Sequence, residues 1–492
     1  MEKDNDVKES SDTDTERAQT EEYRSFVEEP GDDDGENRHP QKRTSILATA
    51  LLETKAMVGS GLLNVPYTFK TLGIIFSIGA SLLFNFITFI SVYFLIRCKD
   101  ITQRYSYAVY SKLTMGYIGD LSCKIAIFVR SISLCCVLLK ILGNILRTLL
   151  LIFFKEYGDK FYLDSKFLVI IFGIIITPLM IQKDISGIAK YTFLGIYSIS
   201  YLFISLVVLF IYKYMKNEIL PWEEQMLHIN GNIFEIFKCF GSYLNAYLFQ
   251  VNVFPIYLPL HPRSTTNMMI STSIGTILSS VIYISFGIIG FAIYRYDING
   301  TLLVYLGDDL INYLKTDKIM AALLIIFEIA FIINTTISLA LNFFSAKSKS
   351  ISIIKLIIKK FQGKKKEDKS EEGTLLESLD ETGHEIEKSK KKSSKEDKED
   401  ILNERSEVFV TLITYFITVT IAYYSDNIIT IDNFNGSTVN NYLSVMLPGL
   451  FFIILTNKEK FSFEKLIAIL LILFSFCLIT GYFLVNFTSI FA

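Results

Sequence analysis

The first long apolar segment of the chain, residues 46–70, is interrupted by the triplet Gly59-Ser60-Gly61. The segment is long enough to span a bilayer, which takes about 20 residues of α-helix. In hydrocarbon every backbone amide and carbonyl must be satisfied, so a spanning helix that unwinds at mid-depth is tolerated only where it lines a cavity or is covered by protein. The interruption therefore predicts a binding site, in which the helix that restarts near Leu62 points its positive N-terminal end at a carboxylate.

A second apolar segment, residues 232–260, is interrupted in the same way. Its centre holds the run Gln250-Val251-Asn252-Val253-Phe254-Pro255, in which the proline removes a backbone donor and disrupts the preceding turn. Five predicted spans separate the starts of the two segments, the spacing expected of an inverted repeat with matching broken helices, which is typical of secondary transporters. The candidate substrate-binding residues are Gly59, Ser60, Gly61, Leu62, Val251, Asn252 and Phe254.

Composition favours a membrane protein independently, because 51% of the 492 residues are hydrophobic, which is unusual for a soluble core. Apolar length predicts an all-α polytopic protein of about eleven spans, at roughly 20 residues each. Its net charge of -2 says little about partners, since most charges lie in tails and loops. The predicted spans are 46–70, 72–97, 121–154, 166–182, 189–212, 232–260, 268–294, 319–346, 406–424, 441–456 and 463–490.

The distribution of Lys and Arg among the short connections favours a cytoplasmic N-terminus. The predicted outer loop 425–440 carries no Lys or Arg, whereas the loop 347–405 is rich in Lys. Two glycosylation triplets, at Asn299 and Asn435, fall in predicted outer loops. We expect an integral protein of the plasma membrane or of an acidic vacuolar or lysosomal membrane, and the residues leave this choice open.

The chain divides into four predicted parts. Residues 1–43 form an acidic tail that should be disordered and cytoplasmic, and residues 44–346 hold spans one to eight. Residues 347–405 form a charged cytoplasmic loop, and residues 406–492 hold the last three spans. At the start of the loop, lysines interleave with isoleucines over 347–366, a pattern typical of a basic amphipathic helix on an anionic lipid surface.

Two motifs resemble the amino acid/auxin permease family, most closely its sodium-coupled neutral amino acid transporter group. Ala56-Met57-Val58-Gly59-Ser60-Gly61-Leu62-Leu63-Asn64-Val65-Pro66-Tyr67 is similar to the family's first-helix motif, and Val253-Phe254-Pro255-Ile256-Tyr257 is similar to its sixth-helix motif. The resemblance implies an eleven-helix, leucine-transporter-type fold with five-plus-five inverted repeats and broken helices 1 and 6. It also implies transport of amino acids by alternating access.

One departure from that pattern concerns the coupling ion. Where the sodium-coupled members carry Ser-Asn-Ala before the helix break, this chain has Thr54-Lys55-Ala56. Lys55 lies about 9 residues into the helix, a depth of roughly 14 Å, where an unpartnered charge costs several kcal/mol. Either its charge takes the place of a sodium ion, so that transport is proton-coupled or ion-independent, or its side chain extends along a tilted helix to the cytoplasm.

The eighth span offers two hydroxyls, Thr336 and Ser338, at positions that resemble the family's second contribution to a sodium site. Such hydroxyls commonly hydrogen-bond a carbonyl one turn earlier in their own helix. They are equally suited to accept a hydrogen bond from the Lys55 ammonium. Lys55, Thr336 and Ser338 are therefore the candidate ion-coupling residues, with a transported proton or Na⁺ as the coupled ion and no bound cofactor.

The function predicted from these features is secondary active transport of amino acids, with neutral substrates favoured. An enzyme is disfavoured because the chain has no phosphate-binding Gly-rich loop, no metal-binding His pair and no nucleophile elbow. The expected partners are the amino acid, the bilayer and anionic lipid at 347–366, without nucleic acid. The alternative is an amino acid sensor that uses the same site and signals through its cytoplasmic segments.

Overall fold

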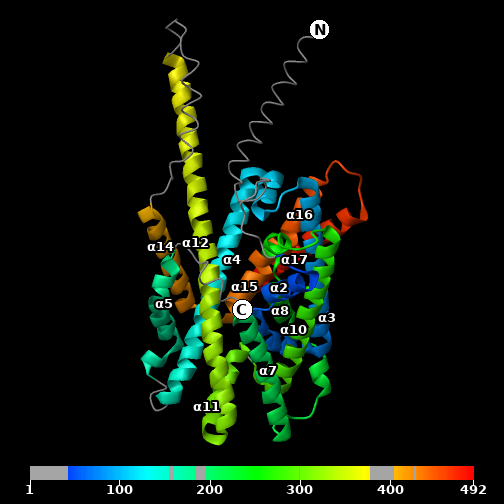
Figure 1. Ribbon diagram of the computed structural model, residues 1–492, viewed down its shortest axis with the longest axis vertical. Helices are drawn as coiled ribbons and strands as arrows, with labels where there is room; N and C mark the ends of the chain where they lie inside the picture. The colour runs from blue at the N-terminus through cyan, green and yellow to red at the C-terminus, as the bar shows by residue number, and fades with distance from the viewer. Residues whose placement is uncertain are drawn as a thin grey trace. The chain divides into compact units, whose positions relative to one another are not determined.

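The computed structural model describes residues 43–154, 160–182, 194–298, 300–376, 404–425 and 428–491. Within these ranges all regular secondary structure is helical, apart from one isolated bridge between Thr44 and Leu260. Residues 44–492 form one compact unit, in which long helices such as α4 and α12 run side by side (Figure 1). The all-α polytopic fold expected from the sequence is confirmed.

The first expected span is broken where the Gly-Ser-Gly triplet predicts. Helix α2 covers Ile46–Met57, a 3₁₀ turn follows over Ser60–Asn64, and α3 covers Val65–Thr102. Gly73 divides α3 into two helices, because its φ of 72° lies in the left-handed region. A Cβ at Gly73 would also lie 2.1 Å from the carbonyl oxygen of His228, so no other residue fits there.

The sixth expected span is broken in the same manner, with α8 (Ile233–Ala246), a 3₁₀ turn (Gln250–Asn252) and the short α9 (Val253–Tyr257). Eight helical segments of the described residues are long and apolar enough to cross a membrane. Together with the broken first and sixth spans and the shorter α5, they account for the eleven expected spans. The other helices are α4 (Tyr107–Phe153), α5 (Ser165–Ile181), α7 (Leu194–Met215), α10 (Thr265–Tyr294), α11 (Leu302–Thr316), α12 (Lys318–Leu376), α14 (Glu404–Tyr424), α15 (Ile428–Phe434), α16 (Leu447–Leu455) and α17 (Phe463–Phe491).

The tenth span begins earlier than predicted, and the prediction of an outer loop at 425–440 was wrong. Helix α15 starts at Ile428 and continues through two π-helical stretches, Asn435–Asn440 and Tyr442–Met446, into α16. The segment contains many polar side chains, but they are buried against other helices. Asn435 is 2% exposed, so its glycosylation triplet lies inside the protein, whereas Asn299 lies outside the described residues.

The helix of the eighth span continues past residue 346, because α12 runs without a break through the basic segment to Leu376 (Figure 1). Two of the basic side chains make contacts within the protein. The Lys347 ammonium donates to the carbonyls of Ile181 and Gln182 at the end of α5, each at 3.2 Å. Lys355 forms an ion pair of 3.0 Å with Glu407 of α14.

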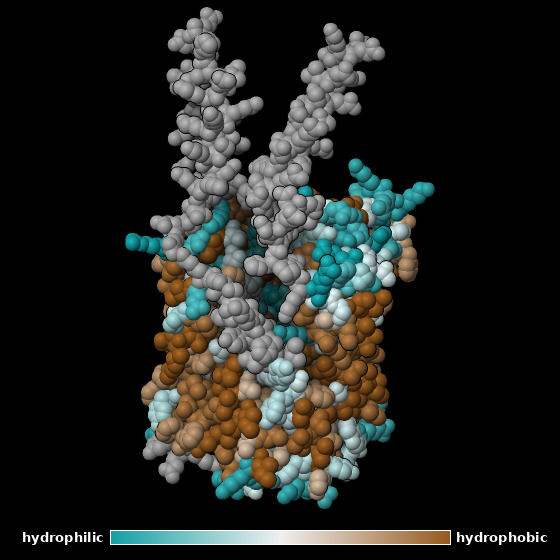
Figure 2. Space-filling view, in the orientation of Figure 1, coloured by the Kyte–Doolittle hydropathy of each residue, from teal (hydrophilic) through white to brown (hydrophobic). Residues whose placement is uncertain are grey.

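The surface of the helical body is strongly apolar. Figure 2 shows hydrophobic side chains over its sides and hydrophilic ones gathered toward the two ends. On α17, for example, Leu470, Leu473 and Phe476 are each more than half exposed. Apolar side chains in such numbers on an outer face are suited to contact with lipid, as expected of a membrane-embedded protein.

Candidate functional site

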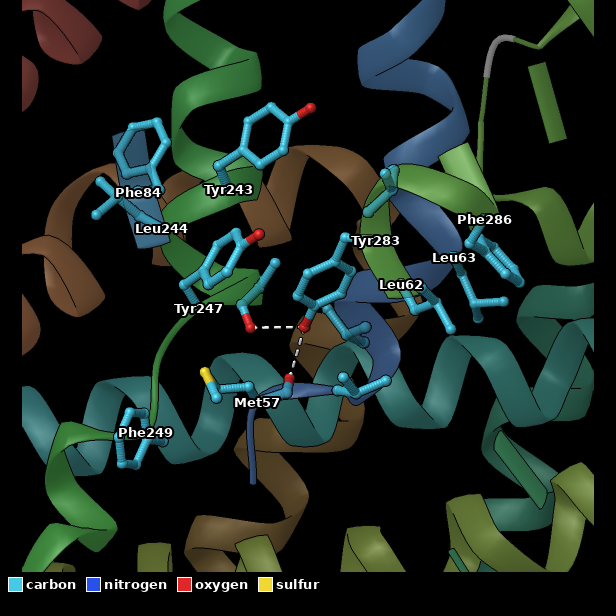
Figure 3. Packing of buried hydrophobic residues seen from close by; sticks show 14 of the residues in the cluster. Met57, Leu62, Leu63, Phe84, Tyr243, Leu244, Tyr247, Phe249, Tyr283 and Phe286 are labelled. Atoms are coloured by element: carbon cyan, nitrogen blue, oxygen red, sulfur yellow. Dashed lines mark hydrogen bonds between the residues drawn. The ribbon is translucent and has the colours of Figure 1, made fainter. Parts of the chain in front are cut away.

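The two helix breaks lie directly against each other. A Cβ at Gly61 would lie 3.3 Å from the Cα of Ala246, so the absence of a side chain at Gly61 permits this close approach. Tyr283 of α10 joins both breaks, because its hydroxyl lies 2.9 Å from the Met57 carbonyl oxygen and 2.7 Å from that of Ala246 (Figure 3). Met57 and Ala246 are the last residues of α2 and α8, whose C-terminal carbonyls lack partners within their own helices.

The residues of the first break differ in their exposure. Gly59 is exposed, although Val58 before it and Leu62 after it are both buried. Ser60 begins the 3₁₀ turn, and its side chain is outside the part of the structure that is described. Gly61 and Leu62 pack into the core, so among the residues of this break whose burial is described, Gly59 is the accessible one.

The second break shows a similar division. Asn252 is exposed and Val251 is half-buried, whereas Phe254 is 2% exposed. The Phe254 ring packs edge-on against Tyr110 of α4, with ring centroids 5.4 Å apart. Phe254 and Leu62 therefore serve as packing residues in this conformation, and Asn252 faces the accessible side of the break.

Lys55 extends from α2 toward α7 and α12. A Cβ placed on Gly195 of α7 would lie 3.9 Å from the Cε of Lys55 and 2.8 Å from the Oδ1 of Asn334. The Lys55 side chain is half-buried, and it makes no hydrogen bond or ion pair with the described residues. Thr336 and Ser338 lie on the same helix as Asn334, and both are half-buried.

A polar network that the sequence did not suggest joins both broken helices to α15. The Asp432 carboxylate accepts a hydrogen bond of 2.7 Å from Asn64 at the end of the first 3₁₀ turn, and another from Asn245 of α8. Asn440 in turn donates to the Asn245 carbonyl oxygen at 2.6 Å. Asp432 is 1% exposed. No local signal reveals it, because the same polar run is also typical of a loop.

Glu53 of α2 is a second acidic residue that the sequence interpretation missed. It is fully buried, and its Oε1 accepts hydrogen bonds from Ser271 at 3.2 Å and Thr272 at 3.3 Å, both on α10. A signal was present here, because Glu53 stands inside an apolar run and acidic residues are rare within spanning helices. Glu328 of α12 is another acidic residue within an apolar run, and it is 1% exposed.

Comparison of the sequence with protein families gives a match to the family described as transmembrane amino acid transporter protein, over residues 42–491. The chain is 24% identical to the sodium-coupled neutral amino acid transporter 7 of Mus musculus over 270 residues, which cover 53% of this chain and 56% of that protein. It is 22% identical to the amino acid transporter AVT6C of Arabidopsis thaliana over 251 residues, 49% of this chain and 57% of that protein. The matches thus span little more than half the length of these relatives.

Solved structures of similar arrangement include the inward-facing conformation of Mhp1, with a TM-score of 0.49 and 10% identity, covering 89% of this chain and 84% of that one. Another is MhsT in complex with L-phenylalanine, with a TM-score of 0.47 and 14% identity, covering 91% of this chain and all of that one.

Proposed function

Because this chain belongs to the transmembrane amino acid transporter family, we propose that it carries amino acids across a membrane as a secondary active transporter. The family is one of transporters and not of enzymes. The observation that best supports transport is the pair of helix breaks bridged by Tyr283. Broken helices that meet within a bundle are the place where such carriers bind substrate and from which alternating access proceeds.

The breaks suit a zwitterionic amino acid. The amides at the restart of the first broken helix would hold the substrate carboxylate, and the carbonyls at the ends of α2 and α8 would hold its ammonium. Residues 58–63 and 247–253 carry no charged side chain, which favours neutral substrates over acidic or basic ones. The exposed positions Gly59 and Asn252 are the first places at which a substrate would meet the protein.

Coupling to protons, or no coupling to an ion, is favoured over coupling to sodium. The name of the Mus musculus relative describes that protein as sodium-coupled, so sodium is the competing ion. Lys55 supports our proposal, because an ammonium that extends toward α12 places a positive charge beside Asn334, on the helix that carries Thr336 and Ser338. A sodium ion bound beside it would be repelled.

The proposal is tested by uptake of labelled neutral amino acids into proteoliposomes that hold the purified protein, under an imposed pH or sodium gradient. We expect uptake that follows the pH gradient or occurs without any ion gradient, and that ignores sodium. Lys55→Asn should change this ion dependence. Uptake that requires sodium at constant pH would refute the role given to Lys55. Substrate binding without any flux would instead support an amino acid sensor.

We also propose that the N-terminus is cytoplasmic and that the protein resides in the plasma membrane or an acidic vacuolar or lysosomal membrane. Support comes from the bias of Lys and Arg toward the connections on one side, including Arg97, Lys99 and Arg263. Epitope tags at the two termini, probed before and after the membrane is permeabilised, test the orientation. An N-terminal tag that is accessible on intact cells would contradict it.

A further inference from the structure

Glu53 lies in the contact between the first broken helix and α10. The buried residues of α2 are Thr49, Ala50, Glu53, Thr54 and Met57, and this spacing places them on one face of the helix. That face packs on α10, where Ser271 and Thr272 are fully buried. Both hydroxyls donate to Oε1 of Glu53, so the carboxyl group is held in place by two hydrogen bonds from α10.

Glu53 has no cationic partner in the described part of the chain. The helices α9 and α10, which pack against α2, contain no Asp, Glu, Lys, Arg or His. Their titratable groups are Tyr257, Tyr283 and Tyr294; the hydroxyl of Tyr283 bonds to backbone carbonyls, and that of Tyr294 bonds to Asp309. Lys99 of α3 donates to Tyr257 and pairs with Asp100.

Lys55 does not serve as that partner, although it is only two residues from Glu53. Residues two apart in an α-helix point in directions about 200° apart. Accordingly, Glu53 faces α10, whereas Lys55 extends toward Gly195 of α7. A buried carboxylate needs either a positive partner or a bound cation, so the charge balance of Glu53 has to come from outside the described side chains.

The packing around the second oxygen, Oε2, admits a proton and little else. Oε2 is buried without a hydrogen-bond partner. A Cβ at Gly275 of α10 would lie only 3.0 Å from Oε2 and 3.0 Å from the Ala50 carbonyl oxygen. Thr54 also holds α2 close to α10 here, because its hydroxyl lies 3.2 Å from the Gly275 carbonyl oxygen. Even a methyl group at residue 275 would crowd this place, whereas a proton on Oε2 needs no added room.

We propose that Glu53 binds the proton that accompanies the amino acid, held between α2 and α10 by Ser271 and Thr272. This inference rests on the proposed transport function and specifies its coupling site. While α2 packs on α10, a proton on Oε2 makes the carboxyl group neutral and Oε1 keeps its two hydroxyl donors. When α2 moves away from α10 as the site opens, these bonds break, water reaches the carboxylate and the proton leaves.

Glu328 of α12 provides a matched comparison. Its Oε2 is also buried without a partner, but the described residues place no hydroxyl donor on its carboxyl group, and it does not lie on a broken helix. Glu328→Gln and Glu53→Gln therefore make the same chemical change at two buried acids, of which only Glu53 is assigned the proton.

The test uses full-length protein in proteoliposomes, with a pH gradient and labelled neutral amino acid. Glu53→Gln should reduce the accumulation ratio to its value without a gradient, while exchange of internal for external amino acid continues at a rate within about threefold of the parent. Glu328→Gln should accumulate as the parent does. Ser271→Ala with Thr272→Val should shift the pH of half-maximal uptake, because two donors to the carboxyl group are lost. Gradient-driven accumulation by Glu53→Gln would overturn the proposal. So would a result in which Glu328→Gln loses gradient-driven accumulation and Glu53→Gln keeps it.

A second measurement separates this inference from transport itself. Infrared spectra of the detergent-solubilised protein over a pH series report the C=O stretch of protonated carboxyl groups. A titrating band that is absent in Glu53→Gln and present in Glu328→Gln supports proton binding at Glu53, even if the parent shows no flux and the proposed function fails. Spectra of parent and Glu53→Gln that titrate identically would overturn the assignment of the proton to Glu53.

Discussion

The hydroxyl of Tyr283 lies 2.9 Å from the carbonyl oxygen of Met57, the last residue of α2. The same hydroxyl lies 2.7 Å from the carbonyl oxygen of Ala246, the last residue of α8. A phenol has one proton to donate, so the two carbonyls share it. Tyr283 thereby links the two breaks through α10, so that a shift of either half-helix changes the hydrogen bond of the other.

Tyr283→Phe removes this link and leaves both carbonyls short of a donor. Without the hydroxyl, the ends of α2 and α8 are no longer held together, so the groups proposed to bind the substrate are less well positioned. We therefore expect substrate affinity to weaken roughly tenfold, which corresponds to about 1.4 kcal/mol. Binding of labelled amino acid to the purified protein measures the effect. Ser285→Ala on the same helix is the control, because the Ser285 hydroxyl donates to carbonyls of its own helix and its loss should have no effect. An unchanged affinity in Tyr283→Phe would contradict this role.

Asp432→Asn should destabilise the protein. A carboxylate accepts from both Asn64 and Asn245, whereas an amide offers one oxygen, so one donor loses its partner. The expected loss is about 1–3 kcal/mol, read as a lower thermal midpoint in detergent. Asp308→Asn, at an exposed position of α11, should shift the midpoint less. A higher midpoint for Asp432→Asn would show that desolvation of the carboxylate outweighs its two hydrogen bonds.

The sequence predicts the helix breaks because their signals are local. Gly59-Ser60-Gly61 and Pro255 act on the backbone within one turn, so the interruptions of the first and sixth spans follow directly from the residues. The packing of the two breaks on each other could not be predicted in the same way. It depends on Tyr283 and on Gly61 meeting Ala246, residues far apart in the chain.

The start of the tenth span was predicted wrongly, because the local hydropathy of this segment is misleading. Residues such as Asp432 and Asn435 lower the apolar content of the segment, and a span chosen by hydropathy therefore begins too late. In the folded protein these groups are shielded from lipid by α8, and π-helical turns accommodate them. The role of Glu53 could not be predicted for a different reason, because its hydrogen-bond partners, Ser271 and Thr272, lie on α10, far away in the sequence.

Gly436→Ala should destabilise the protein strongly. A Cβ at Gly436 would lie 1.9 Å from the carbonyl oxygen of Gly241, so α8 and the π-helical stretch could no longer approach each other. We expect a loss of several kcal/mol, at or above the usual ~1–3 kcal/mol of overpacking. Gly79→Ala is the control, since nothing lies within 4 Å of the added Cβ and alanine is the better helix former. Thermal unfolding of both variants tests this, and equal midpoints would refute it.

Binding of anionic lipid by the basic start of the 347–405 segment remains a proposal, tested with a matched pair of triple variants. Lys364, Lys365 and Lys366 lie within the proposed lipid-binding region, whereas Lys390, Lys391 and Lys392 lie beyond it. Each lysine near an anionic surface contributes about 1 kcal/mol. Changing the first three to Gln should therefore abolish any activation of uptake by phosphatidylserine, and added salt should weaken that activation in the parent. Equal loss in both triple variants would indicate a general charge effect.

A double-mutant cycle tests whether the Lys55 charge acts at the contact with α7 and α12. A Cβ at Gly195 would lie 2.8 Å from the Asn334 Oδ1, so Gly195→Ala should displace the amide beside Lys55 and lower uptake several-fold. Lys55→Met keeps most of the aliphatic stem and removes the charge. If the amide acts on the charge, Gly195→Ala should have little further effect in the Lys55→Met background, because residues that share one interaction are not additive. Additive losses would mean that the glycine matters only for helix packing and that Lys55 works elsewhere.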